Sequence, residues 1–420
     1  MNTPTILLIG AGVMAEPYLD AAARNGVRIA LVETRERLEA LTSRYPIHDQ
    51  ETLPSSEIGH DTGWIRSALA LADRLAAARV PWGCLAFSEP HVIAASLVQD
   101  LHRLPGPGTR ASMSSRNKAL QRTQLDNVVA QPTFILAGKV ADAEPWLRAH
   151  VPAVVKPVDG MGSSGVQRVT TLSDIDELVS TRSGDGPVLC EQYVAGQEYS
   201  FEALVIAGQP VLTNLTHKTT QDQVHFVEVA HRVGFESIDP TLAQEAQRTL
   251  ELVIGRLGIR DSVVSMEFRE SGGRAVVMET MVRMPGDHIW EAIARARNVD
   301  LYEAHLNLAL GRPSAWASPF PYQAQPHPVA GRFGTCFLVA PRQGTFRAIN
   351  WGEWTQSSDL LRHGERISPG TPVRPAESSA DRVAYAIVRA ADDEQLTARL
   401  RDLLDPARVI LNDDDEVKAS

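Results

Sequence analysis

The chain has 420 residues, of which 44% are hydrophobic and 22% are charged, and its formal net charge is −10. A chain of this length and apolar content can bury several cores, so we expect a globular protein of two to four packed units. The negative charge is spread along the chain without a basic face, which argues against a nucleic-acid or anionic-membrane partner and favours small-molecule substrates.

The first 110 residues alternate short apolar runs with segments of helical periodicity, a pattern that is typical of a doubly wound α/β sheet. Strands are expected at Thr5–Ile9, 29–33 and 84–87, and helices at 16–25, 36–45, 64–79 and 92–101. The first apolar run is too short for a signal peptide or a membrane span, and no basic residue precedes it. We therefore expect a cytoplasmic protein with an amino-terminal Rossmann-like sheet.

The turn after the first strand has two interpretations. Gly10-x-Gly12-x-x-Ala15 fits the loose form of the dinucleotide fingerprint, and Glu33 ends the second strand, where a ribose-binding acid could lie. So short a pattern recurs by chance. A tight turn that lets the strand and the helix pack closely also explains both glycines, and we favour it over a nucleotide contact.

Two breaks rich in proline and glycine divide the rest of the chain. The first is at residues 104–108 and the second at 311–313, which gives three units, 1–110, 111–312 and 313–420. In the last unit we expect irregular chain around the prolines at 319–328 and a strand at 333–339. Short strands and turns should follow through Gly344, Gly364 and Gly370, and then a helix at 393–404. The acidic segment 413–416 is expected to be a solvated tail.

The three cysteines, Cys84, Cys190 and Cys336, are far apart and odd in number. Their spacing gives neither a disulfide framework nor a CxxC metal site. We expect three buried side chains that act as small apolar residues.

The segment 153–169, AVVKPVDGMGSSGVQRV, predicts a strand that ends at Lys156, a loop of glycines and serines, and a second strand. Such a hairpin can clamp phosphate, because glycines let backbone N–H groups approach, serines add hydroxyl donors and the lysine adds a charge. It lacks the GxxxxGK[ST] pattern and a following helix, so it is not a P-loop. A surface hairpin without a ligand is the alternative for this segment alone.

The segment 188–194, VLCEQYV, is an apolar strand that runs into Glu191 and Tyr193, and Glu198 follows. A strand that leads into a linker can hold an adenine, with backbone groups near Gln192 and Val194 reading the base edge and a later carboxylate accepting ribose hydroxyls. An ordinary strand with exposed acids remains the alternative. Another strand is expected from Tyr199 onwards.

Two adjacent apolar runs, joined by the turn Ser271-Gly-Gly273, each carry one glutamate, Glu267 and Glu279. A hairpin places these carboxylates side by side, where they repel each other unless a cation lies between them. Mg²⁺ prefers such oxygen ligands, shared with phosphates. The alternative is a buried glutamate that pairs with Arg283.

In this order and at these spacings, the three segments resemble the ATP-grasp superfamily and, within it, the amino-acid ligases that make dipeptides. The resemblance extends over nearly the whole chain, including Arg116-Asn-Lys118-x3-Arg122. It implies an ATP-grasp fold, α/β overall and α+β in the ATP-grasp part. The implied order is a Rossmann-like pre-ATP-grasp domain at 1–110, an ATP-grasp domain at 111–312 with a lid subdomain at about 125–195, and a β-rich C-terminal domain at 313–420.

The resemblance also implies a role for each matching residue. The α- and β-phosphates would be contacted by Lys118 and Lys156, and the γ-phosphate would be covered by a mobile loop of Gly162, Ser163, Ser164 and Gly165. Adenine would be bound by Glu191, Tyr193 and Val194, ribose by Glu198, and phosphate or adenine by Lys218. Mg²⁺ would be bound by Glu267 and Glu279, and the phosphate or the acyl intermediate would be contacted by Arg283. Two positions depart from the family: Met281 replaces a frequent asparagine ligand, and Ser265 replaces a frequent basic residue.

The implied activity is the ATP-dependent joining of a carboxylate to an amine, most specifically of two amino acids, through an acyl phosphate, with ATP and Mg²⁺ as cofactors and with Lys156 and Arg283 as the catalytic groups. The implied assembly is a homodimer. The candidates for substrate contacts are Glu228, His231, Arg283, Asp287, His288 and Arg332, because they are polar groups near the predicted reaction centre. Two alternatives remain open. One is a carboxylase or purine-pathway ligase of the same fold, and the other is a nucleotide-binding protein that has lost catalysis, for which Met281 is the only indication.

Overall fold

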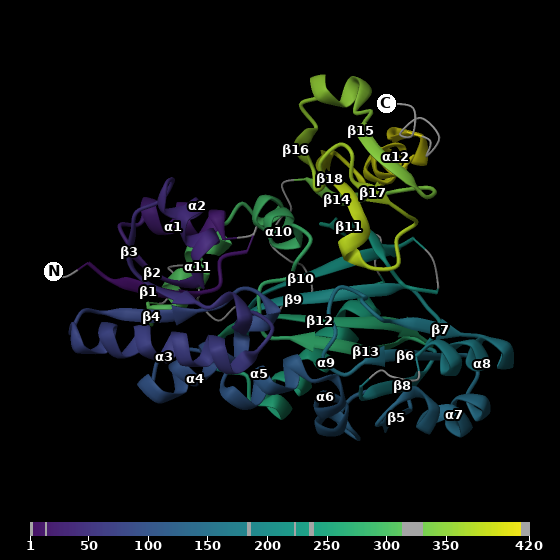
Figure 1. The fold of residues 1–420 in the computed structure, drawn as a ribbon, viewed down its shortest axis with the longest axis horizontal. Helices are drawn as coiled ribbons and strands as arrows, with labels where there is room; N and C mark the ends of the chain where they lie inside the picture. Colours follow the sequence, from purple (N-terminus) through teal and green to yellow (C-terminus); the bar gives the residue numbers. More distant parts are fainter. Residues whose placement is uncertain are drawn as a thin grey trace.

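The computed structural model describes residues 3–12, 15–182, 186–221, 224–234, 239–312 and 331–412. These residues form four β-sheets with helices packed around them, and Figure 1 shows how the sheets are arranged. The mixed α/β class that the sequence predicts is confirmed.

The amino-terminal sheet is parallel, with the strand order β3-β2-β1-β4. Its strands are β1 (Thr5–Ile9), β2 (Arg28–Thr34), β3 (Ile47–Leu53) and β4 (Trp82–Leu85), and its helices are α1 (Glu16–Arg24), α2 (Arg35–Thr42), α3 (Asp61–Ala77) and α4 (Val92–His102). Alternate residues of β1 face opposite sides: Ile6 and Leu8 pack with α1, while Leu7 and Ile9 pack with α3 and α4. The expected elements are confirmed, and β3 is an additional edge strand that the sequence did not reveal.

A small antiparallel sheet, with the order β5-β8-β6-β7, lies at the lower right in Figure 1. Its strands are β5 (Phe134–Ala137), β6 (Ala153–Pro157), β7 (Gln167–Val169) and β8 (Val188–Gln192), and it packs against α7 (Val140–Ala149) and α8 (Leu172–Thr181) through a separate apolar core. We call this unit the lid sheet. Helices α5 (Thr109–Arg116) and α6 (Lys118–Leu125) precede it.

The largest sheet has eight strands in the order β13-β12-β9-β10-β11-β14-β18-β16. The strands are β9 (Glu198–Ile206), β10 (Gln209–Thr220), β11 (Glu228–Val233), β12 (Ser262–Ser271), β13 (Arg274–Met281), β14 (Arg332–Val339), β16 (Leu360–Glu365) and β18 (Arg382–Ala390). Helix α9 (Pro240–Leu257) covers one face, and α10 (Ile289–Arg297) and α11 (Leu301–Ala309) join the core shared with the amino-terminal sheet. Because β11 pairs with β14, the sheet continues into the carboxyl-terminal part of the chain.

The carboxyl-terminal part adds a three-stranded sheet, β17-β15-β19, above the end of the large sheet (Figure 1). Its elements are β15 (Gly344–Ile349), β17 (Pro372–Val373), β19 (Val409–Asn412) and α12 (Asp393–Leu403). Short 3-10 turns are η1 (Ser55–Glu57), η2 (Glu89–His91), η3 (Gly352–Gln356), η4 (Ser379–Asp381) and η5 (Pro406–Arg408). The expected irregular chain at 319–328 and the acidic tail at 413–416 lie outside the described residues.

All three cysteines are buried and free, as the sequence predicts. Among the described residues, none of the helices combines the length and the apolar character that crossing a bilayer requires.

Candidate active site

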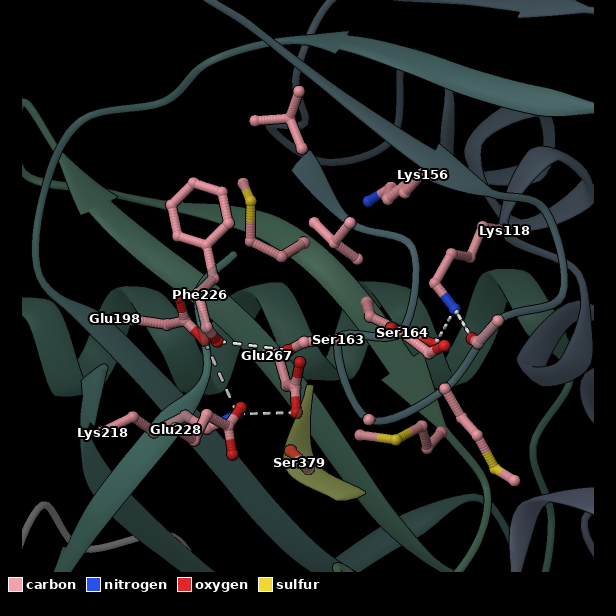
Figure 2. Close-up of a pocket in the computed structure, with 18 of the residues that line it drawn as sticks. Lys118, Lys156, Ser163, Ser164, Glu198, Lys218, Phe226, Glu228, Glu267 and Ser379 are labelled. Atoms are coloured by element: carbon pink, nitrogen blue, oxygen red, sulfur yellow. Dashed lines mark hydrogen bonds and ion pairs between the residues drawn. The ribbon is translucent and has the colours of Figure 1, made fainter. Parts of the chain in front are cut away.

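A cavity of about 260 Å³ lies between the lid sheet and the large sheet. Its lining comes from the lid sheet with its Gly/Ser loop, from the large sheet, from Lys118 of α6, from the segment between β13 and α10, and from Glu89 and Ser379 of the two terminal parts. Figure 2 shows the charged side chains gathered around it, with Lys118 and Lys156 on one side and Lys218 among glutamates on the other.

Glu267 and Glu279 stand directly opposite each other on β12 and β13. The turn between the strands has Gly272 at φ 60° and Gly273 at φ 74°, the left-handed geometry of a two-residue hairpin. A bulge after Glu267 shifts the register by one residue and brings the two acids into line. Both side chains line the cavity, so the hairpin delivers two carboxylates to one wall.

Lysines balance these carboxylates. Lys118 Nζ lies 2.9 Å from Glu279 Oε1, and Lys218 Nζ lies 2.7 Å from Glu267 Oε1. Burial raises the pKa of Glu267, against the opposing effect of Lys218, and the nearby carboxylates of Glu228 and Glu279 raise it further. Burial would also raise the pKa of Glu279, but the ammonium groups of Lys118 and Lys156 lower it on balance.

The pair fits a divalent cation, because two carboxylates on adjacent strands, with oxygens facing a cavity, are the donors that Mg²⁺ takes. The carboxylate oxygens of Glu198, Glu228 and Glu267 also lie within 4.8 Å of one another, but Lys218 Nζ lies among them, 2.5 Å from Glu228 and 3.6 Å from Glu198. That ammonium takes the central place that a metal ion would need in this group. In the facing pair, Lys118 and Lys218 each contact a different carboxylate, so we take this pair as the candidate metal site.

Lys156 reaches the cavity from β6 and is held by a buried network. Glu191 Oε2 lies 2.6 Å from Lys156 Nζ, and Glu191 Oε1 lies 2.5 Å from Arg122 Nε. Burial lowers the pKa of Lys156, against the opposing effect of Glu191. The side chain of Glu191 thus points at Lys156 and Arg122. The sequence did not mark Arg122 as a site residue, and its place in the motif just after Lys118 was the available signal.

Aromatic rings form the wall beyond the glutamates. The rings of Tyr193 and Phe226 stack with centroids 6.2 Å apart, and the guanidinium of Arg168 lies 3.7 Å from the centre of the Tyr193 ring. Arg269 pairs with Glu198 at 3.0 Å and donates to the carbonyl of Val194 at 3.1 Å. This end of the cavity offers flat apolar surface next to a carboxylate, which suits a base and a sugar.

The Gly/Ser loop, residues 160–165, crosses the mouth of the cavity. Gly162, Ser163 and Gly165 all have positive φ, which turns the loop sharply. Ser163 Oγ donates to the carbonyl of Phe226 at 3.2 Å, as Figure 2 shows, and the backbone N–H of Ser379 donates to the carbonyl of Gly162 at 2.9 Å. The loop is closed over the site in this structure.

Arg283 is the cation at the far end of the cavity. Its Nε lies 2.6 Å from Glu89 Oε2, and Ser115 Oγ donates to Glu89 Oε1 at 3.2 Å. Burial would lower the pKa of Arg283, but Glu89 raises it on balance. The sequence did not indicate Glu89 as a site residue. The available signal was its position just after β4, because polar groups that follow parallel strands collect at one edge of the sheet.

The remaining candidates for substrate contacts do not all reach the cavity. Glu228 and Asp287 line it, whereas His231 is buried behind them, with Nε2 3.2 Å from Asp287 and 3.4 Å from Glu228. His288 stacks on the Tyr385 ring, and Arg332 pairs with Asp393 at 2.8 Å. Neither of the two lines the cavity.

Side chains of the protein occupy the space beside the glycine turn at residues 10–12. Glu33 Oε2 accepts a hydrogen bond from the backbone N–H of Ala11 at 2.6 Å. A Cβ at Gly10 would lie 2.0 Å from the ring of His91. This geometry supports the tight-turn interpretation over a dinucleotide contact.

Comparison with known proteins agrees with this geometry. Residues 149–289 match the model of the ATP-grasp domain family, and residues 336–412 match the L-amino acid ligase C-terminal domain 2. The L-arginine-specific L-amino acid ligase of Bacillus subtilis is 22% identical over 307 residues, 70% of this chain and 71% of that protein.

Two further relatives extend the comparison. An uncharacterized protein of Sinorhizobium fredii is 26% identical over 301 residues, 68% of this chain, and the chain spans only 59% of that relative's length. The crystal structure of the L-amino acid ligase from Bacillus licheniformis superposes with a TM-score of 0.79 at 19% identity and covers 98% of this chain and 99% of that one. The expected fold is thereby confirmed.

Proposed function

We propose that the chain is an ATP-dependent carboxylate-amine ligase that joins two amino acids, because residues 149–289 match the ATP-grasp domain and the chain is similar to L-amino acid ligases. The observation that carries the proposal is the facing pair Glu267 and Glu279 beneath the closed loop 160–165. In the proposed reaction, the first carboxylate attacks the γ-phosphorus of ATP and gives an acyl phosphate and ADP. The amine then attacks the acyl carbon and displaces phosphate.

The cavity can hold the nucleotide along its length. Adenine would lie on the aromatic wall next to the backbone of Val194, and Glu198 would accept the ribose hydroxyls. Three ammonium groups, those of Lys118, Lys156 and Lys218, line the path for the phosphates. In this proposal, Glu191 acts on ATP indirectly, because its carboxylate orients Lys156.

Glu267 and Glu279 would hold Mg²⁺, which neutralises charge on the phosphates when it is bound. Lys118 and Lys218 already lie beside these two acids. Each ammonium can therefore turn from its carboxylate towards a phosphate oxygen without leaving the cavity wall. The loop residues Gly162, Ser163, Ser164 and Gly165 would add backbone and hydroxyl donors from above.

The acyl-transfer end is formed by Arg283 and two carboxylates. Arg283 would stabilise the negative charge that develops on the transferred phosphoryl group and on the acyl oxygen. Glu228 and Asp287 face the same space and would accept the α-ammonium group of the first amino acid, with His231 behind them fixing their positions. Closure of the loop would keep water from the acyl phosphate.

We also propose that the chain works as a cytoplasmic homodimer and that its domains are 1–110, 111–312, with the lid at about 125–195, and 313–420. The resemblance supports the homodimer. The separate core of the lid sheet supports the lid subdomain. The core that the amino-terminal sheet shares with α10 and α11, and the pairing of β11 with β14, cross the other two boundaries, so these rest on the resemblance.

Phosphate release tests the proposed function. The purified chain is incubated with ATP and Mg²⁺ and with single amino acids, pairs of amino acids, or bicarbonate, and the amide product is followed by mass spectrometry. We expect release that depends on a pair and is matched by a dipeptide. Release that requires bicarbonate would instead show a carboxylase, and nucleotide binding without turnover under all conditions would show a protein without catalysis.

A further inference from the structure

A short turn of the carboxyl-terminal part, Ser378–Arg382, lies against the loop that covers the phosphates. Ser379 is the first residue of the 3-10 turn η4, and the side chain of Ser378 caps the turn. The backbone N–H of Ser379 points out of the turn and donates to the carbonyl of Gly162 at 2.9 Å. Ser379 also lines the cavity, and Figure 2 shows it beside the loop.

The same turn reaches the substrate end of the cavity. Arg382 follows η4 directly, and its side chain is fully buried, 2.7 Å from Asp287 Oδ1. The guanidinium also lies 4.2 Å from the centre of the Phe337 ring. Burial would raise the pKa of Asp287, but Arg382 lowers it well below its usual range. Within five residues, the turn therefore contacts both the phosphate-covering loop and an acid of the substrate end.

Other contacts of the loop come from different parts of the chain. Ser163 bonds to Phe226 between β10 and β11, Lys118 Nζ donates to the carbonyl of Gly160, and Arg182 Nη1 donates to the carbonyl of Gly165 at 2.9 Å. In the part of the chain that the structure describes, the hydrogen bond between Ser379 and Gly162 fastens the loop to the carboxyl-terminal part. A covering loop must stay closed for as long as a hydrolysable intermediate lies beneath it.

We propose that the turn Ser378–Arg382 is a latch that holds the loop 160–165 closed over the activated acid, with Ser379 as its contact to the loop and Arg382 as its anchor at the substrate end. The inference rests on the proposed ligase function. Ser379 and Arg382 are positioning residues, because they act through the loop and through Asp287. Loss of the latch lets water compete with the amine, so that ATP is consumed without amide formation.

Ser379→Pro removes the N–H that makes the contact. Proline fits the first position of a helical turn, and Ser378 before it is already extended, at φ −150° and ψ 168°. Ser379→Ala is the matched control, since it keeps the N–H and loses only the hydroxyl. Phosphate and amide are measured together under saturating ATP and substrates. We expect the wild type and Ser379→Ala to release about one phosphate per amide, and Ser379→Pro at least about threefold more. Equal ratios in the two variants would overturn the proposal.

Hydrogen exchange of the segment 158–168, with a non-hydrolysable ATP analogue bound, tests the latch without any ligation. Faster exchange in Ser379→Pro than in Ser379→Ala is expected, and identical exchange would contradict the latch. The two measurements separate the two proposals. If the wild type makes no amide from any pair, the proposed function fails, whereas the exchange experiment still decides whether Ser379 holds the loop.

Discussion

Glu267 and Glu279 are partners in one register pair, yet their surroundings shift their pKa values in opposite directions, up for Glu267 and down for Glu279. Burial raises both, but Glu279 faces two lysines across the cavity, whereas Glu267 shares one lysine with other carboxylates. Glu279 therefore keeps its negative charge more readily than Glu267, and Glu267 gains most from a cation placed between them.

Glu279→Ala should abolish metal binding and turnover. The change removes one of the two facing carboxylates, and we expect amide formation to fall by on the order of 100-fold or more. Binding of Mn²⁺ to the complex with an ATP analogue, followed by electron paramagnetic resonance, checks the cause directly. Glu270→Ala, on the same hairpin but outside the cavity, is the control. Unchanged activity in Glu279→Ala would refute the metal assignment.

Lys156→Ala should raise the KM for ATP and also lower kcat, because the ammonium acts on phosphates in both the bound and the transition state. We expect kcat/KM for ATP to fall by about 10- to 100-fold. The exposed Lys139, in the same lid unit, provides the control Lys139→Ala. Steady-state kinetics with varied ATP measure both constants. A KM and kcat equal to those of the control would exclude a contact between Lys156 and the phosphates of ATP.

Glu89→Gln should slow acyl transfer without weakening ATP binding. The substitution keeps the shape of the side chain but removes the charge that holds Arg283. We expect kcat to fall by about tenfold, with the KM for ATP unchanged. Glu57→Gln, which alters an exposed pair with Arg66, is the control. A rise in the KM for ATP with unchanged kcat would place Glu89 in nucleotide binding instead.

Glu202 should make stability depend on pH. It is fully buried, accepts hydrogen bonds from Ser200, Asn214 and Thr216, and burial raises its pKa to about 7. The folded state keeps the proton at pH values where the unfolded chain has released it. The free energy of unfolding should therefore fall as the pH rises from about 4.5 to about 7, by on the order of 3 kcal/mol.

Glu202→Gln should remove this decline, because glutamine stays neutral throughout. Urea unfolding at about pH 5 and about pH 8 measures the difference for both proteins. The control variant Glu270→Gln, at a partly buried glutamate of β12, should retain the wild-type decline. An equal decline in the wild type and in Glu202→Gln would show that Glu202 is ionised in the folded state.

Much of the site could be predicted because its parts are local in sequence. The two glycines between β12 and β13 fix a tight hairpin, and the glutamates lie at similar distances from it. The sequence could not show the bulge after Glu267, without which that residue would face Met278. The sequence therefore predicted the hairpin and the two acids side by side on it, and the register confirms this, whereas the bulge that brings them into line was not predicted.

The parts that could not be predicted depend on contacts between distant segments. Glu89 meets Arg283 across 194 positions of sequence, and Arg382 meets Asp287 across 95. No periodicity or spacing records such pairs. Arg332 illustrates the reverse problem, because a suitable charge near the expected site turned out to be paired with Asp393, away from the cavity. Strand β3 was missed because its buried positions are few and its pattern is polar.

The carboxylate of Glu33 accepts a hydrogen bond from the backbone N–H of Ala11, in the turn where the dinucleotide fingerprint presents its donors to a phosphate. A phosphate that used this donor would have to displace Glu33 and would meet its negative charge. The turn is therefore better suited to close packing than to anion binding, and the chain that follows β4 in the same sheet brings Glu89 to the cavity.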